Sequence, residues 1–387
     1  MIVPFEKELT DYSIITAVNL ERYSQGLQQK VVAILSQAQK EILAEVLSKD
    51  PTATKLRVTR KLRATKLSSQ IDYILKKSYK SISDTVVKEL SIVAALEAKS
   101  LIGLLNNLIS INLFQANLTD EYLKSIVENT LIQGGTIREW FNTQAKNASQ
   151  RLTRSLADAV YKSNLMQIGK IRGDSISNLV SAVRGMTVDG KSGPLKLSRR
   201  EAETLVKTSV MQVINQTRYI MLMENEDLLK GFMIIAVLDT KTSSMCESLD
   251  HTQYDLEWNS LGGRKSKISG PPPWHWGCRS VYIPILDKFS DIVERSKKGE
   301  TTLGKRLTQK LEDKLLEVEE RASANKLVPE SINYNDWLKT QPRTVQIDVL
   351  GKARQKIWED KGLPITDLVS QKNRSITLSE LKKMYEK

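Results

Sequence analysis

Cysteine and histidine are scarce in this 387-residue chain, which contains two of each. Two cysteines are too few for the disulfide framework of a small secreted protein, and a reducing compartment would keep them as thiols or metal-bound thiolates. Two histidines leave little capacity for general-base catalysis near neutral pH. The composition therefore excludes a disulfide scaffold and disfavours enzymes that depend on paired histidines.

Long apolar runs are also lacking, and we expect no leader sequence. No uninterrupted apolar stretch approaches the roughly 18 to 20 residues that a bilayer span needs. Residues 1–10 do not have the basic-then-apolar order of a secretory signal peptide. We therefore expect no membrane span and a protein made in the cytosol.

The chain nevertheless has the apolar content of a folded protein. Hydrophobic residues make up 40% of it and only 10 residues are proline. At roughly 100 to 200 residues per domain, its length predicts two or three units. The net charge of +13 excludes an acidic disordered chain.

Positive charge is concentrated in one early segment. Between residues 55 and 80 the only acidic residue is Asp72, and the basic residues are Lys55, Arg57, Arg60, Lys61, Arg63, Lys66, Lys76, Lys77 and Lys80. Lysine and arginine bind phosphates without needing a particular base sequence, so one interpretation is non-specific contact with nucleic acid. The other interpretation is a solvated helix face. The only aromatic residues here are Tyr73 and Tyr79, which disfavours a base-stacking platform for single strands.

Residues 1–185 are expected to form helix after helix. Apolar positions spaced three and four apart on one helical face include Val31, Ile34, Leu35, Ala38 and Ile42. Pro51, the Gly134-Gly135 pair and the turn-rich segment 189–194 predict helix breaks. Because no second half of a core is evident, we expect an extended helical arm that binds other subunits through its apolar stripe.

A small α+β module is predicted after this arm. Residues 198–229 have helical periodicity, with Ser198 as the N-cap and Glu201 completing a capping box. The apolar run 231–238 and the segment 280–285 predict two neighbouring strands. A long irregular loop joins these strands, and such loops usually carry function or need a stabilising cross-link, which we call a staple.

The C-terminal residues predict a small helical unit after a linker near residues 297–302. Its apolar side would comprise Trp337, Leu338, Val349, Leu350 and Trp358. The predicted fold class is therefore mainly α. It has a long helical N-terminal arm (1–130), a small α+β module with a short sheet and a long stapled loop (131–290), and a linker with a helical C-terminal tail (291–387).

All the cysteines and histidines of the chain fall in the loop between the two predicted strands. They are Cys246, His251, His275 and Cys278, and chance is a poor explanation for their clustering. The spacing of His275 and Cys278 can turn an imidazole and a thiolate toward one ion, and the other two would close a tetrahedral zinc site. A structural zinc ion would also explain how an irregular loop stays folded. The alternative is two small buried thiols and a core imidazole packed between its two tryptophan neighbours.

Several sequence motifs lie between residues 130 and 290. They are Ser198-Arg199-Arg200-Glu201-Ala202-Glu203-Thr204; Thr208 with Asn215 and Arg218; Leu238-Asp239-x-x-Thr242-x-x-x-Cys246-x-x-Leu249-Asp250; and Gly270-Pro271-Pro272-Pro273-x-His275-x-x-Cys278-Arg279-Ser280. Together they resemble the head morphogenesis, or minor head, proteins of tailed bacteriophages, typified by protein F of phage Mu. A further block between Tyr334 and Arg354 resembles a segment that often follows this domain.

Three departures from that family's pattern bear on a metal site. Many members have Cys-x-x-Cys where this chain has Ser243 and Cys246, a glycine in place of His251, and a further cysteine in place of Ser280. Either His251 replaces a lost ligand, or the loop is held by tryptophan packing and hydrogen bonds alone.

The resemblance implies a structural minor capsid protein that acts in head morphogenesis at the portal vertex or the capsid interior of the virion. It would be made in the bacterial host cytoplasm. Its partners would be the portal protein, the major capsid protein or both, and the packaged double-stranded DNA through non-specific contact. No enzymatic activity is expected.

The alternative function is a metal-dependent hydrolase or nuclease packaged in the virion. In that case His275 would be a general base or zinc ligand, and Asp239 or Asp250 would complete the centre. The sequence contains no Walker loop, nucleophile elbow or His-Glu-x-x-His motif to support it.

Overall fold

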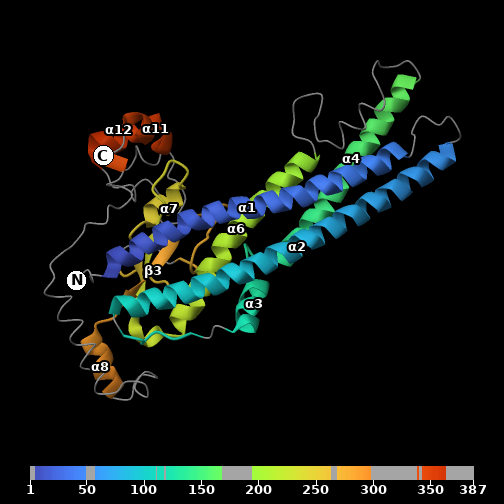
Figure 1. Cartoon of the computed structure of the whole chain (residues 1–387). Coiled ribbons are helices and arrows are strands. Elements are labelled where there is room, and N and C mark those ends of the chain that lie inside the picture. Colours follow the sequence, from blue (N-terminus) through green and yellow to red (C-terminus); the bar gives the residue numbers. More distant parts are fainter. Residues whose placement is uncertain are drawn as a thin grey trace. The chain divides into compact units, whose positions relative to one another are not determined.

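The protein is mainly helical and carries one small antiparallel sheet (Figure 1), which confirms the predicted fold class. This computed structural model describes residues 5–48, 57–109, 111–116, 119–167, 194–262, 268–297, 338–339 and 342–362. The elements are α1 (Phe5–Ser48), α2 (Arg57–Ile109), α3 (Asp120–Asn129), α4 (Ile137–Gln167), α6 (Pro194–Met223), η1 (Glu226–Leu228), β1 (Leu229–Ile235), α7 (Ser244–Leu249), β2 (Gln253–Tyr254), β3 (Val281–Leu286), α8 (Phe289–Lys297), α11 (Arg343–Leu350) and α12 (Lys352–Lys361).

The chain divides into two units. The first, which we call the bundle unit, comprises Arg22–Ile92 and Lys124–Val210. The second, which we call the sheet unit, comprises Met1–Glu21, Val93–Leu123 and Met211–Lys387. Because α1, α2 and α6 each contribute residues to both units, the units do not follow the boundaries at 130 and 290 that the sequence suggested.

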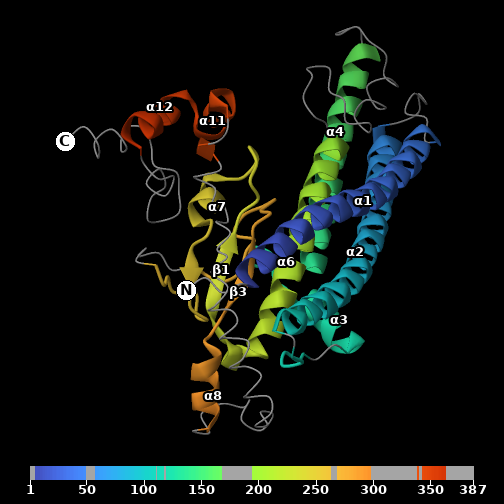
Figure 2. The same ribbon diagram turned by 60° about the vertical axis from the view of Figure 1, so that its left-hand side comes forward.

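Four long antiparallel helices, α1, α2, α4 and α6, make up most of the bundle unit, which also includes the C-terminal part of α3. Polar side chains link each helix to the next around the bundle: Lys30 to Glu89 (2.6 Å), Ser68 to Thr153 (3.1 Å), Arg151 to Glu201 (2.6 Å) and Arg199 to Gln39 (2.6 Å). These pairs join α1 to α2, α2 to α4, α4 to α6 and α6 back to α1 (Figure 2). The bundle is therefore closed within one chain.

The apolar stripe of α1 is buried inside this bundle. Val31, Leu35, Ala38 and Ile42 are buried and Ile34 is half-buried. Their spacing of four, three and four residues repeats every 11 residues, which keeps one face of a nearly straight helix toward its neighbours. We expected this stripe to bind other subunits. That expectation is wrong for these residues, because α2, α4 and α6 supply the other half of the core within the same chain.

Two predicted helix boundaries have different outcomes. The Gly134-Gly135 pair separates α3 from α4, as predicted, and Gly134 has a φ of 87°, which only glycine adopts at little cost. The predicted N-cap at Ser198 is wrong, because α6 already begins at Pro194 and the Ser198 hydroxyl donates to the Pro194 carbonyl (2.7 Å). The fixed φ of proline suits the first turn of a helix. Pro51 and residues 189–193 lie outside the described residues.

The sheet unit contains a three-stranded sheet in the order β2-β1-β3, with both pairings antiparallel. The two predicted strands are confirmed as β1 and β3. Helix α6 lies along this sheet: Asn215 Nδ2 donates to the Ser280 carbonyl (3.1 Å), and the Tyr282 hydroxyl donates to the Asn215 carbonyl (2.9 Å). Phe232 stacks on Trp258 with ring centroids 4.8 Å apart, which closes the core over the sheet.

The C-terminal helices α11 and α12 contact each other. Leu338, Leu350 and Trp358 are buried, and Gln355 Nε2 donates to Gln346 Oε1 (3.2 Å). This agrees with the predicted helical tail. Trp337 lies outside the described residues, as does the side chain of Val349.

Among the described residues, the helix Lys66–Ile109 is long and apolar enough to cross a membrane by length and composition alone. Core helices of soluble proteins pass the same test. In this segment Ile71, Leu75 and Tyr79 are buried in the bundle unit.

Candidate metal centre

The short helix α7 carries the first of the clustered cysteines. Ser243 is its N-cap, with φ −74° and ψ 150°, and its hydroxyl accepts a hydrogen bond from the Cys246 backbone N–H (3.3 Å). This cap fixes the first turn of α7. Cys246 is 2% exposed and packs against Ala236 and Cys278.

The loop that leads into β3 carries the other two clustered residues. Trp274 Nε1 donates to the Gly270 carbonyl (3.0 Å), and the Cys278 backbone N–H donates to the His275 carbonyl (3.2 Å). Gly277 has a φ of 74°, so the tight turn between His275 and Cys278 favours glycine. This turn brings both side chains to the same side of the loop.

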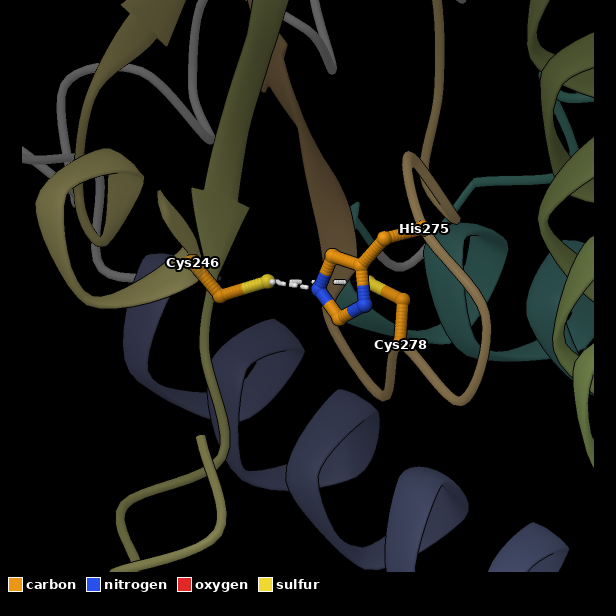
Figure 3. A group of neighbouring side chains, drawn as sticks. All are labelled: Cys246, His275 and Cys278. Atoms are coloured by element: carbon orange, nitrogen blue, oxygen red, sulfur yellow. Dashed lines mark hydrogen bonds between the residues drawn. The ribbon is translucent and has the colours of Figure 1, made fainter. Parts of the chain in front are cut away.

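Cys246, His275 and Cys278 converge on one point (Figure 3). The Cys246 sulfur is 3.2 Å from His275 Nε2 and 3.6 Å from the Cys278 sulfur. The one ligand atom that each residue offers lies within 4.8 Å of the others. Both cysteines are buried and His275 is half-buried, so this group could hold a metal ion.

The two buried sulfur atoms influence each other's ionisation, and their pKa values shift in opposite directions. The hydrogen bond with Cys246 lowers the pKa of the Cys278 thiol well below its usual value, and the His275 ring lowers it further. The same contact with Cys278 raises the pKa of Cys246 well above its usual value, and burial adds to the rise. A buried thiolate needs a nearby cation, because burial penalises an unpaired charge.

An ion pair next to the cluster ties its two sides together. Arg279 follows Cys278 directly, and its Nη1 donates to Asp239 Oδ2 (2.6 Å) while Nη2 donates to Oδ1. Such a bidentate pair is strong and geometrically specific. Asp239 lies shortly before α7, so the pair fixes the segment that carries Cys246 against the segment that carries Cys278.

His251 does not join the cluster. It lies in the turn before β2 with a φ of 57°, and its backbone N–H donates to the Ile234 carbonyl (2.8 Å). Its Nδ1 lies 2.9 Å from Asp250 Oδ2. The turn that starts β2 therefore directs this side chain to Asp250, and the prediction of His251 as the fourth ligand needs correction.

The hydroxyl of Ser243 lies beside the cluster and was missed as a functional candidate. Its Oγ is 2.9 Å from His275 Nε2. One feature of the sequence could have indicated this role. Ser243 lies three residues before Cys246, which is the spacing of the two cysteines in the Cys-x-x-Cys motifs of many zinc sites.

The basic segment is only partly within the described residues. Lys66, Lys76, Lys77 and Lys80 are exposed on α2, and Lys76 forms an ion pair with Asp72 (2.6 Å). The side chains of Arg57, Arg60, Lys61 and Arg63 lie outside the described residues although their backbone belongs to α2, and Lys55 lies outside altogether.

Comparison of the chain with known proteins identifies no relative. No protein-family model, no curated protein and no solved structure matches it. The likeness to phage head morphogenesis proteins therefore stands on the motif residues alone.

Proposed function

We propose that the chain is a structural minor capsid protein of a tailed bacteriophage, acting in head morphogenesis at the portal or the capsid interior. The observation that supports this most directly is where the motif residues lie. Those of the sheet unit are used in buried and half-buried contacts that hold the module together. Asn215 ties α6 to β3, Arg218 pairs with Glu97, and Asp239 pairs with Arg279.

A structural zinc ion at Cys246, His275 and Cys278 is part of this proposal. With Zn–S bonds of about 2.3 Å, the sulfurs of a tetrahedral site lie about 3.8 Å apart, and a sulfur and a nitrogen about 3.5 Å apart. The two sulfur atoms are 3.6 Å apart and the Cys246 sulfur is 3.2 Å from His275 Nε2, which is close to these ideal ligand–ligand distances. The donor set of two thiolates and an imidazole also suits zinc. The ion would supply folding energy to the loop between β1 and β3.

The hydrolase or nuclease alternative has less support from the same residues. Both carboxylates that it would use have other partners: Asp239 is bound by Arg279, and Asp250 Oδ1 accepts from the Ala236 backbone N–H (2.7 Å). A carboxylate held in this way is poorly placed to activate water at the cluster. A structural role for the module therefore agrees better with these contacts.

The first prediction tests the proposed role in the virion. The full chain would be expressed with the portal and major capsid proteins of the same phage, and assembled heads would be purified on a density gradient. We expect the chain to co-sediment with the heads in low copy number and to be released only when they are disrupted. A chain that stays at the top of the gradient contradicts the proposal, and nuclease activity abolished by Cys278→Ser would favour the alternative function.

The second prediction concerns DNA contact by α2. Replacing the exposed residues Lys66, Lys77 and Lys80 with glutamine should weaken binding of the full chain to duplex DNA. The slope of log K against log salt should become shallower by about two to three, because each phosphate contact contributes about 0.9. Binding would be titrated at several ionic strengths.

A triple variant with the same charge change serves as the control for DNA binding. Lys230, Lys241 and Lys288 are also exposed, but they lie in the sheet unit. Their replacement with glutamine should leave the slope nearly unchanged. Equal effects of the two triple variants would show that net charge, and not the α2 surface, governs binding.

A further inference from the structure

The Ser243 hydroxyl is in contact with one of the three ligand atoms and with the backbone of a second ligand residue. Its Oγ lies 2.9 Å from His275 Nε2. Because it caps α7 by accepting from the Cys246 N–H at 3.3 Å, the hydroxyl is held in this place. The hydroxyl oxygen has two lone pairs, so one remains to bind another partner after the other has accepted the Cys246 N–H.

We infer that Ser243 Oγ is the fourth ligand of the metal ion at Cys246, His275 and Cys278, so that the centre is closed by protein oxygen and not by water. This inference rests on the proposed metal centre. In a tetrahedral zinc site a nitrogen and an oxygen ligand lie about 3.3 Å apart. Ser243 Oγ and His275 Nε2 are 2.9 Å apart, so the two atoms need to separate only slightly to reach this distance.

Charge also favours a hydroxyl at this position. A divalent ion with two thiolates and a neutral imidazole has no net charge. The cysteines are 2% and 1% exposed, and a third thiolate as the fourth ligand would leave a buried negative charge that costs free energy. A neutral hydroxyl completes the coordination without that cost.

Two other side chains near the cluster are less suited to this role. The Ser280 hydroxyl is buried and makes no hydrogen bond to Cys246 or His275, and its main-chain carbonyl is tied to Asn215, which fixes this residue on the β3 side. Asp250 accepts from Ala236 N–H and contacts His251. Among these candidates, Ser243 alone contacts both Cys246 and His275. Ser280 is therefore a matched control.

The test uses the full chain with Co²⁺ in place of Zn²⁺, because the visible absorption of Co²⁺ reports its coordination. Azide is the probe for an open position. We expect the spectrum of the unchanged protein to be insensitive to azide. In Ser243→Gly, which keeps a good N-cap, we expect a spectrum that responds to azide and a Co²⁺ affinity lowered at least about 10-fold.

Two further variants separate the hydroxyl from general disturbance of the site. Ser243→Thr keeps a hydroxyl and should behave like the unchanged protein, as should Ser280→Ala. An azide response in the unchanged protein, or an unaltered affinity in Ser243→Gly, would overturn the assignment of Ser243 while leaving the metal centre in place. Failure of the unchanged protein to bind Co²⁺ or Zn²⁺ would overturn the metal centre itself.

Discussion

Cys278→Ser is expected to abolish stoichiometric zinc binding and to lower the melting temperature of the full chain. Replacing the partners that merely orient a ligand costs 10- to 100-fold in metal affinity, so loss of a sulfur ligand should cost more than about 100-fold. Where zinc is present at about 100 times its Kd, its loss removes about 2.7 kcal/mol of stabilisation. Metal analysis of the purified protein and thermal melts with and without a chelator measure both effects.

The control for this prediction lies on the same short helix. Ser248 is fully buried on α7, and its hydroxyl donates to the Met245 carbonyl (2.8 Å). Ser248→Ala should lower the melting temperature without changing the zinc content. If zinc does not co-purify with the unchanged protein and Cys278→Ser melts at the same temperature, the cysteines are merely buried thiols. A bond between the two sulfurs at about 2.05 Å would instead identify a disulfide formed in an oxidising medium.

The three residues that cluster were predictable from the sequence, but the position of His251 outside the cluster was not. Cys246, His275 and Cys278 come together as predicted, because the two strands that flank their loop pair with each other and close it. The place of His251 depends on the turn into β2, where its backbone N–H bonds to Ile234. Spacing along the chain contains no information about such a turn, so it could not separate His251 from Ser243.

The helices themselves were predicted more reliably than the elements that pack against them. The periodicity of Val31, Leu35 and Ile42 identified the buried face of α1 correctly. It could not identify what covers this face, because an apolar stripe has the same period whether its partner is a helix of the same chain or another subunit. Helix α6 begins at Pro194, whose fixed φ suits the first turn of a helix, and not at Ser198, where the sequence has a favourable capping pattern.

A buried ion pair was the least predictable feature of the sheet unit. Arg218 of α6 is 1% exposed and Glu97 of α2 is 6% exposed, and Arg218 Nε donates to Glu97 Oε1 (2.5 Å). The Arg218 guanidinium also lies 5.7 Å from the centre of the Tyr12 ring, within reach of a cation–π contact. The sequence signal was an acidic residue within the apolar segment 92–98, which has meaning only once its partner is known.

Glu97→Gln is expected to destabilise the full chain by about 3 to 5 kcal/mol, because it leaves the Arg218 charge buried without its counter-ion. Denaturant unfolding would measure this loss. The exposed pair of Arg138 and Asp84 is a matched control, and Asp84→Asn should cost less than about 1 kcal/mol. Replacing both buried partners, as in Glu97→Leu with Arg218→Met, should recover much of the stability, since neither charge then remains to be desolvated. Equal costs for Glu97→Gln and Asp84→Asn would mean that water reaches Arg218, and the pair would then not fasten α6 to α2.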